Sequence, residues 1–244
     1  MISVCMATYN GEKFIEGQIK SILDQLSELD ELVISDDGSN DTTIDIINKI
    51  GDSRIKLLHG GFHSPIKNFE NAIMNATGDV IFLADQDDIW LPGRICEAVK
   101  LHADLNRPIM LTFCKAQVID ENGNSIEESR FNYLHPTKRS FLRNLLRNHY
   151  MGCCMSFRRE LLDYILPFPK GIMMHDSWIG LVAQFYFNCE LIGEKPYMLY
   201  RRYGTNYTEL HQQKLTQKIF QRLFYMYQIL CVGLKNKIWK RRGL

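Results

Sequence analysis

The stretch at residues 80–90 constrains the fold more than any other part of the sequence. It opens with an apolar run at residues 80–84 and then places three carboxylates within four positions, at Asp85, Asp87 and Asp88. The length and β-branched content of the run are typical of a buried strand. A strand that is apolar on both faces belongs in a parallel sheet covered by helices, and such sheets bind ligands at the carboxyl ends of their strands.

Three carboxylates this close together repel one another, so gathering them at a strand end costs free energy unless a cation joins them. Their oxygen atoms are the ligands that Mg²⁺ or Mn²⁺ prefers, and in proteins these ions commonly bind a substrate diphosphate as well. The acids therefore predict a divalent-metal site. Taken alone, they also fit a solvated acidic turn that closes the strand.

The first hundred residues alternate between strands and helices four times, which predicts a parallel sheet with right-handed crossovers. We expect strands over residues 2–7, 31–35, 54–58 and 80–84 and helices over residues 12–26, 44–50, 66–76 and 94–105. The second strand also ends on acids, Asp36 and Asp37, which should project from the same edge of the sheet as Asp85.

The second half is less regular. We expect a strand over residues 108–119, a polar loop over residues 127–138, a helix that begins within residues 171–178 and runs to residue 187, and two edge strands over residues 189–192 and 196–202.

Composition places the chain among globular proteins. Of its 244 residues, 45% are hydrophobic and 23% are charged, which excludes a disordered chain. The net charge of +1 gives no indication of nucleic-acid binding. The seven cysteines show no CxxC or zinc spacing, which favours reduced thiols and a cytosolic setting. No signal peptide or run of about 20 apolar residues is apparent, so we expect no membrane-spanning helix.

The last thirty residues have a different charge pattern. From Lys214 onward there are eight basic and no acidic residues, which leaves a net charge of −7 for the rest of the chain. The apolar residues in this tail recur at three- and four-residue intervals, as expected for a helix. They are Leu215, Ile219, Leu223, Met226, Leu230, Leu234 and Ile238. We interpret the tail as an amphipathic helix on an anionic membrane surface, with packing on the protein body or a partner subunit as the alternative.

Together, four motifs resemble the metal-dependent, inverting nucleotide-sugar glycosyltransferases of family 2, which have the GT-A fold. The motifs, in chain order, are Ala7-Thr8-Tyr9-Asn10, Ser35-Asp36-Asp37-Gly38-Ser39-Asn40-Asp41, Phe82-Leu83-Ala84-Asp85-Gln86-Asp87-Asp88-Ile89-Trp90 with Leu91-Pro92-Gly93-Arg94, and Met174-His175-Asp176-Ser177-Trp178 with Tyr200-Arg201-Arg202-Tyr203-Gly204-Thr205-Asn206. The last is similar to the acceptor side of bacterial surface-polysaccharide and rhamnosyltransferase-like enzymes. Each motif alone is weak, and their order at the expected strand ends strengthens the resemblance.

The resemblance implies an α/β GT-A domain over residues 1–210, followed by a basic helical tail over residues 211–244. It assigns Asp87 as the first metal ligand, and Asp85 as a second ligand or a donor-binding residue. Asp88 would support the metal site or cap the next turn.

The nucleotide would be bound by the turns that follow the first two strands. Asp37 would accept a hydrogen bond from the imide N–H of uracil or thymine, and Tyr9 would stack on the base. Thr8 would lie close to the base and Asp36 would orient the turn. A plain tight turn is the alternative for Asp36 and Asp37. For Arg201, the alternatives are a contact with the diphosphate and a structural salt bridge.

On the acceptor side, the resemblance assigns Asp176 as the general base, with helix capping as the alternative. Burial beside Trp178 would have to raise the proton affinity of Asp176. Trp178 would line the acceptor pocket or belong to the core, and Gly152 would allow close backbone approach. His175 is expected to be a structural hydrogen-bonding partner, and Lys67 to be exposed. The sequence departs from the family at Ser177, where an aromatic residue is common, and at Tyr203, where a histidine is common.

The sequence therefore predicts transfer of a sugar from a UDP- or dTDP-sugar to a growing, lipid-linked glycan. The enzyme would use Mg²⁺ or Mn²⁺ at the inner face of the plasma membrane. Two alternatives are a nucleotidylyltransferase and a carbohydrate-binding or scaffolding module without catalysis. The first alternative requires a glycine-rich phosphate loop, and residues 7–11 do not provide one.

Overall fold

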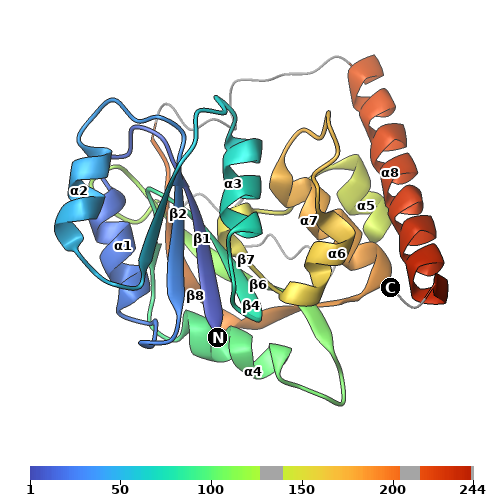
Figure 1. The fold of residues 1–244 in the computed structure, drawn as a ribbon, viewed down its shortest axis with the longest axis horizontal. Helices are drawn as coiled ribbons and strands as arrows, with labels where there is room; N and C mark the ends of the chain where they lie inside the picture. Colours follow the sequence, from blue (N-terminus) through green and yellow to red (C-terminus); the bar gives the residue numbers. More distant parts are fainter. Residues whose placement is uncertain (127–139, 204–214, 243–244) are drawn as a thin grey trace.

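A single mixed sheet with helices on both faces forms the body of the protein (Figure 1). The computed structural model describes residues 1–126, 140–203 and 215–242, with only the backbone described at 215–218 and 237–242. The elements in order are β1 (Ile2–Thr8), α1 (Ile15–Leu23), β2 (Glu31–Asp36), α2 (Thr43–Ile50), β3 (Ile55–His59), α3 (Pro65–Met74), β4 (Val80–Asp85), β5 (Ile89–Trp90), α4 (Arg94–His102), β6 (Ile109–Ile119), α5 (Phe141–Leu146), η2 (Gly152–Cys154), β7 (Met155–Arg158), η3 (Arg159–Leu161), α6 (Leu162–Ile165), α7 (His175–Tyr186), β8 (Asn188–Arg201) and α8 (Leu215–Arg242).

The amino-terminal half has the expected architecture. All eight of its expected strands and helices are present, each within about three residues of its expected ends. Strands β3, β2, β1 and β4 lie next to one another in that order and are all parallel. This prediction of a parallel βα unit is confirmed.

The second half makes the sheet mixed. Strand β7 pairs antiparallel with both β4 and β6, and the short β5 pairs antiparallel with β8. The two edge strands expected over residues 189–202 are one strand, β8, which lies between β6 and β5. The sequence predicts a break between these two edge strands near Gly193. Instead, the pairing of β8 with β6 shifts in register at this point, and the strand continues.

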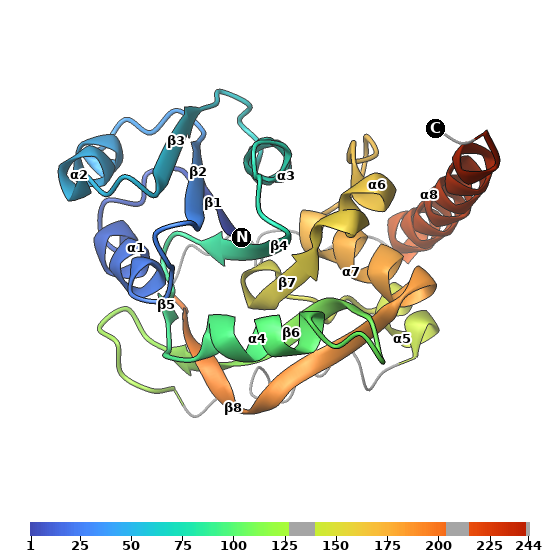
Figure 2. The same cartoon turned by 60° about the horizontal axis from the view of Figure 1, so that its bottom comes forward.

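Two apolar cores explain the layers. Helices α1, α2 and α4 place Ile19, Ile47 and Ile95 in the core on one face of the sheet. On the other face, α3, α6 and α7 bury Phe69, Ile165 and Ile179, among others. Figure 2 shows α4 and α3 on opposite sides of the sheet.

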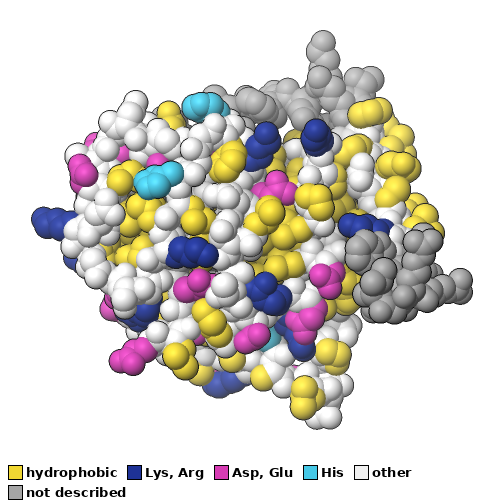
Figure 3. All heavy atoms as spheres, viewed as in Figure 1, with side chains coloured by type: hydrophobic (Ala, Val, Ile, Leu, Met, Phe, Trp, Pro, Cys, Tyr) yellow, Lys and Arg dark blue, Asp and Glu magenta, His cyan; other side chains and the backbone are white. Residues whose placement is uncertain are grey.

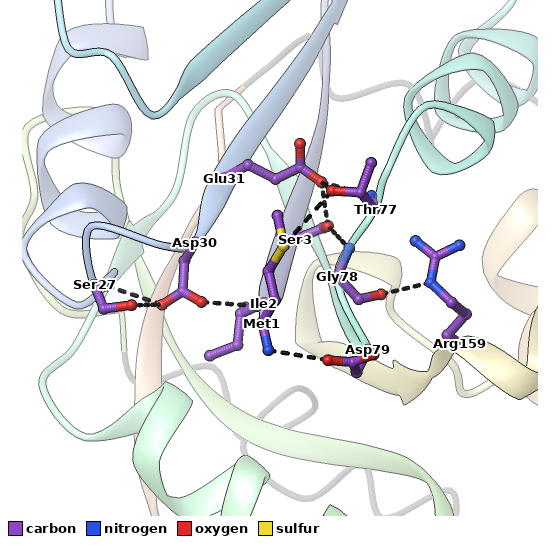
Figure 4. A network of polar contacts seen from close by, with 10 residues as sticks. All are labelled: Met1, Ile2, Ser3, Ser27, Asp30, Glu31, Thr77, Gly78, Asp79 and Arg159. Atoms are coloured by element: carbon purple, nitrogen blue, oxygen red, sulfur yellow. Dashed lines mark hydrogen bonds and ion pairs between the residues drawn. The ribbon is translucent and has the colours of Figure 1, made fainter.

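Polar contacts fasten the amino-terminal edge of the parallel strands (Figure 4). The Asp30 side chain accepts from the Ile2 backbone N–H at 2.7 Å, and the Ser3 hydroxyl donates to Glu31 at 2.6 Å. Arg159 donates to the Gly78 carbonyl at 2.8 Å and so ties β7 to the same edge. These contacts hold the strand starts in register and leave the opposite edge for ligand binding.

Helix α8 packs on the outside of the layer formed by α5, α6 and α7 (Figure 2). Tyr225 and Ile229 are buried in the core. The Tyr186 hydroxyl donates to the Ile229 carbonyl at 2.5 Å, and Arg222 donates to the Leu146 carbonyl at 2.6 Å. One face of the tail is therefore packed on the body, as in the alternative interpretation.

The opposite face of α8 is apolar and exposed. Six of its side chains are each more than half exposed: Ile219, Phe220, Leu223, Tyr227, Leu230 and Leu234. Four of them belong to the expected apolar stripe. The side chains of Leu215 and Ile238, also in that stripe, are not described. The polar loop expected over residues 127–138 lies outside the described residues as well. In the part of the chain that the structure describes, no helix is both long and apolar enough to cross a bilayer.

Candidate active site

The acids of β2 and β4 lie at the same edge of the sheet. Strand β1 lies between these two strands, and its Thr8 is paired with Asp36 while its Ala7 is paired with Asp85. Both pairs are at the carboxyl ends of parallel strands, where ligands bind in open α/β sheets. The prediction that the two acidic turns meet at one edge is confirmed.

Asp36 organises the turn after β2. Its carboxylate accepts hydrogen bonds from the Thr8 hydroxyl at 2.8 Å, the Gly38 and Ser39 backbone N–H groups at 3.0 and 2.8 Å, and the Ser39 hydroxyl at 2.6 Å. Four donors satisfy both oxygens. Gly38 has a φ of 85°, a value that favours glycine. Asp36 therefore fixes the turn, in agreement with the expected orienting role.

Asp37 holds the loop between β3 and α3. Its Oδ1 accepts from the backbone N–H groups of residues 61–63, at distances between 2.5 and 3.1 Å. Among the described residues, its Oδ2 accepts only from the Ser64 backbone N–H, at 2.8 Å, and so keeps acceptor capacity. A base N–H could donate to Oδ2. Recognition of the base by Asp37 stays a prediction.

Gln86 joins the two strand ends that flank the site. It accepts from the Tyr9 backbone N–H at 2.9 Å and donates to the Tyr9 carbonyl at 3.1 Å. The Tyr9 side chain is 53% exposed, so its ring is accessible to a base. Sequence reasoning missed Gln86, although its position between Asp85 and Asp87 was a usable signal.

Asp85 and Asp88 form a compact group of possible metal ligands with Cys153. One ligand atom of each lies within 4.8 Å of the others. Asp88 is buried, its Oδ1 accepts from the Arg201 backbone N–H at 3.0 Å, and its Oδ2 has no partner among the described residues. Burial, followed by repulsion from Asp87 and Asp176, raises the pKa of Asp85 to about 7. Burial and the other two acids of the cluster raise the pKa of Asp88 well above its usual range.

These residues fit a hard divalent cation. An ion would provide the missing partner of Asp88 Oδ2 and relieve the repulsion that raises both pKa values. The hydrogen bond with Cys154 lowers the pKa of Cys153, but burial and the two acids outweigh it and keep the thiol neutral. Carboxylate oxygens are thus the better ligands for Mg²⁺ or Mn²⁺.

Asp87, the first ligand expected from the sequence, is outside this group. Its Oδ2 accepts a hydrogen bond from the Tyr203 hydroxyl at 2.9 Å. Burial raises the pKa of Asp87, while that hydrogen bond lowers it. Tyr203 is thus a hydrogen-bond donor to the Asp87 carboxylate. Metal binding by Asp87 stays a prediction.

Arg201 lies beneath the acid cluster. Its side chain donates to the backbone carbonyls of Asp87, Asp120 and Glu121 at 2.9, 3.1 and 2.9 Å, and the guanidinium is 4.4 Å from the Phe14 ring centroid. Arg201 therefore connects the acidic turn after β4 to the turn that follows β6 through these hydrogen bonds. Contact with a donor diphosphate stays a prediction.

Asp176 lies in the first turn of α7 and is buried. Burial raises the pKa of its carboxyl to about 6, despite hydrogen bonds from Ser177, Asn148 and Gly152 that lower it. Asp176 lies against Gly152, with its Cβ 3.5 Å from the position of a Cβ on that glycine, and the next residue, Cys153, belongs to the group with Asp85 and Asp88. A carboxylate with a pKa near 6 is mostly ionised at neutral pH and is a better proton acceptor than an ordinary aspartate. Sequence reasoning missed Asn148, which no motif marks.

His175 packs differently from the expectation. Neither ring nitrogen has a hydrogen-bond partner among the described residues, and the ring stacks on Phe69 with centroids 3.9 Å apart. Burial lowers the pKa of His175 to about 3, so the ring is neutral. A Cβ on Gly152 would lie 2.6 Å from His175 Nε2, which explains why glycine is required there. The close approach expected at Gly152 is present.

Trp178 is buried, and its indole N–H donates to the Ile165 carbonyl at 2.9 Å. It also lines a cavity next to α8, so it is both a core residue and a wall residue. Contact with the acceptor stays a prediction. Lys67 is exposed, as expected.

The mixed sheet, the two ordered turns and the acid cluster at its carboxyl edge define a glycosyltransferase of the GT-A fold. Residues 3–166 match the family model Glycosyl transferase family 2. The chain belongs to that family.

Two curated relatives match most of the chain. One, from Escherichia coli, is the UDP-Glc:alpha-D-GlcNAc-diphosphoundecaprenol beta-1,3-glucosyltransferase WfgD, 27% identical over 97% of this chain and 94% of its own length. The other is the dTDP-rhamnosyl transferase RfbG of Shigella flexneri, 27% identical over 82% of this chain and 72% of its own length.

Among solved structures, S. aureus TarS 1-349 in complex with UDP-GlcNAc superposes with a TM-score of 0.72. Its sequence identity to this chain is 19%, so the similarity supports the fold. The match covers 94% of this chain and 66% of the solved chain.

Proposed function

We propose that this protein transfers a sugar from a UDP- or dTDP-sugar to a hydroxyl of a growing, lipid-linked glycan, with inversion at the anomeric carbon. The observation that carries the proposal is the buried Asp176, which lies against Gly152, next in the chain to Cys153 of the acid group, and whose pKa burial raises to about 6. The donors and the lipid-linked acceptor named for WfgD and RfbG support this choice of substrates.

In the proposed reaction, the acceptor hydroxyl oxygen forms a bond to the anomeric carbon while the bond from that carbon to the diphosphate oxygen breaks. Asp176 takes the hydroxyl proton, and the nucleoside diphosphate leaves with the bonding electron pair. Displacement from the opposite side inverts the configuration. Burial excludes water from Asp176 and so limits the competing hydrolysis.

The carboxylates of Asp85 and Asp88, with Asp87 beside them, would hold Mg²⁺ or Mn²⁺. A bound cation of this kind neutralises the charge that develops on the leaving diphosphate. Thr8 and Asp36 keep the nucleotide turn in place, Asp37 Oδ2 accepts from the base, and Tyr9 stacks on it.

We further propose that the exposed apolar face of α8 binds the inner surface of the plasma membrane. Six large apolar side chains in contact with water are unfavourable, and the basic residues of the tail suit an anionic bilayer. This arrangement would bring the active site to a lipid-linked acceptor.

A panel of nucleotide sugars tests the proposal directly. We expect a UDP- or dTDP-sugar to raise the melting temperature only with Mg²⁺ or Mn²⁺, and the protein to release nucleoside diphosphate slowly in the absence of acceptor. GDP- and CMP-sugars are the matched controls. Stabilisation by every nucleotide, or by none with either metal, would contradict the proposed donor site.

A further inference from the structure

A cavity of about 780 Å³ lies between the start of α3, the loop that precedes α7, and α8. This volume is within the range of pockets that bind small organic ligands. Its wall is mostly apolar and includes Ile66, Leu166, Phe168, Ile172, Trp178 and Val232. Figure 3 shows apolar side chains between α3 and α8 on this face, with basic and acidic side chains among and around them.

We propose that this cavity binds the hydrocarbon chain of the lipid-linked acceptor next to its diphosphate, an inference that rests on the proposed function. The ligand class is an isoprenoid or alkyl chain that ends in a phosphate or diphosphate. Lys67, Lys170 and Lys235 line the cavity, and the exposed Lys67 and Lys170 would contact the phosphates.

The charges around the cavity suit such a ligand. Lys67 and Lys170 are exposed, and a lysine can lay its methylene stem on an apolar wall while its ammonium group meets a phosphate in water. Glu70 and Asp163 also line the cavity. However, Glu70 already accepts from the Phe168 backbone N–H at 2.5 Å and so holds the wall in place. The lining thus carries three lysines and two acids.

Helix α8 contributes residues both to the cavity and to the exposed apolar face. Cys231, Val232 and Lys235 of α8 line the cavity, while Leu230 and Leu234 of the same turns are more than half exposed. If the exposed face lies in the interfacial layer of a membrane, the cavity opens at the depth of the lipid headgroups. A lipid chain could then enter from the bilayer without crossing water.

The cavity wall and the proposed base share one segment of chain. Ile172 and Trp178 line the cavity, and Asp176 lies between them in the sequence. The Met173 backbone N–H donates to the Tyr225 hydroxyl of α8 at 3.1 Å, which fastens this segment to the helix that forms the other wall. A chain in the cavity would therefore place its attached sugar next to the segment that carries Asp176.

The test is calorimetric titration of the full chain with farnesyl diphosphate, without metal so that the donor site does not compete. We expect saturable binding, and binding weaker by at least about tenfold in Val232→Trp because the larger ring fills the cavity. Ile66→Phe narrows the opposite wall and serves if Val232→Trp does not fold. Lys170→Glu should weaken binding by about fivefold, while Lys49→Glu on the distant helix α2 makes the same charge change and should have no effect.

Two comparison ligands complete the test. Inorganic diphosphate lacks the chain and decyl maltoside lacks the phosphate, so both should bind much more weakly than farnesyl diphosphate. Unchanged affinity for farnesyl diphosphate in both cavity variants, or equal affinity for decyl maltoside, would overturn the assignment. Metal-dependent binding of UDP should persist in the cavity variants. Its absence from the unmodified protein would instead contradict the donor site, so the two failures can be told apart.

Discussion

Replacing Asp176 with asparagine is expected to stabilise the protein while it removes catalysis. Burial raises the pKa of Asp176 from 3.8 to about 6. Because the folded protein binds this proton more tightly than the unfolded chain, protonation of Asp176 favours the folded state. This contribution to the free energy of unfolding is complete below pH 3.8 and is lost as the pH rises to about 6. At about 1.36 kcal/mol per pH unit, the ionised carboxylate costs about 3 kcal/mol of folding free energy above that range, and Asp176→Asn removes this cost.

Urea unfolding at two pH values measures this effect. At pH 8, the free energy of unfolding of Asp176→Asn should exceed that of the original protein by about 3 kcal/mol, and at pH 5 by about 1.5 kcal/mol because the carboxyl is then partly protonated. Asp45→Asn, on the exposed surface of α2, should change the stability by less than about 0.5 kcal/mol at either pH. An equal gain at both pH values, or no gain, would refute the reasoning from burial.

The same variant tests catalysis. Transfer should fall by about two to four orders of magnitude, the usual contribution of a general base. In the original protein, activity should rise with pH through about 6 as Asp176 loses its proton. This rise should be absent from the residual activity of Asp176→Asn.

Three further perturbations test other parts of the site and the tail. Asp88→Asn should abolish the rise in melting temperature that Mn²⁺ causes, because it removes a carboxylate from the ligand group. An unchanged rise would count against that group. Gly152→Ala should destabilise the fold by about 1–3 kcal/mol in thermal unfolding and lower turnover, because the new Cβ would lie 2.6 Å from His175 Nε2. Normal stability and turnover would show that the loop can move without cost. The double variant Leu223→Gln/Leu230→Gln should reduce sedimentation with anionic vesicles at least about tenfold and leave turnover of a water-soluble acceptor unchanged. Undiminished sedimentation would argue against this face as the membrane contact.

The strand ends near Asp36 and Asp85 were predictable because their sequence signal is local. An apolar run followed by acids marks both the strand and its carboxyl end, and parallel pairing then places all such ends at one edge. The bonds that make Asp36 a structural residue are also local, since three of its four donors come from Gly38 and Ser39.

The parts that could not be predicted depend on contacts between distant segments. Asn148 contacts Asp176 only because the loop before η2 folds back to α7, and no spacing in the sequence indicates this approach. Strand β5 has two residues and exists because β8 pairs with it, about 110 residues later. The grouping of Asp85 and Asp88 with Cys153 is likewise a contact between distant segments, since Cys153 follows Asp88 by 65 residues.

Helix α8 shows why a periodic pattern alone did not decide between the two interpretations of the tail. The sequence stripe through Leu223 and Leu230 is the exposed side of the helix, while Tyr225 and Ile229 fix it to the body. The helix is therefore apolar on two sides. A helix that served only to stabilise the body would gain nothing from a second apolar face, since exposed leucines add no packing. The second face is available to a partner, and the eight basic residues of the tail are the reason for proposing an anionic bilayer as that partner.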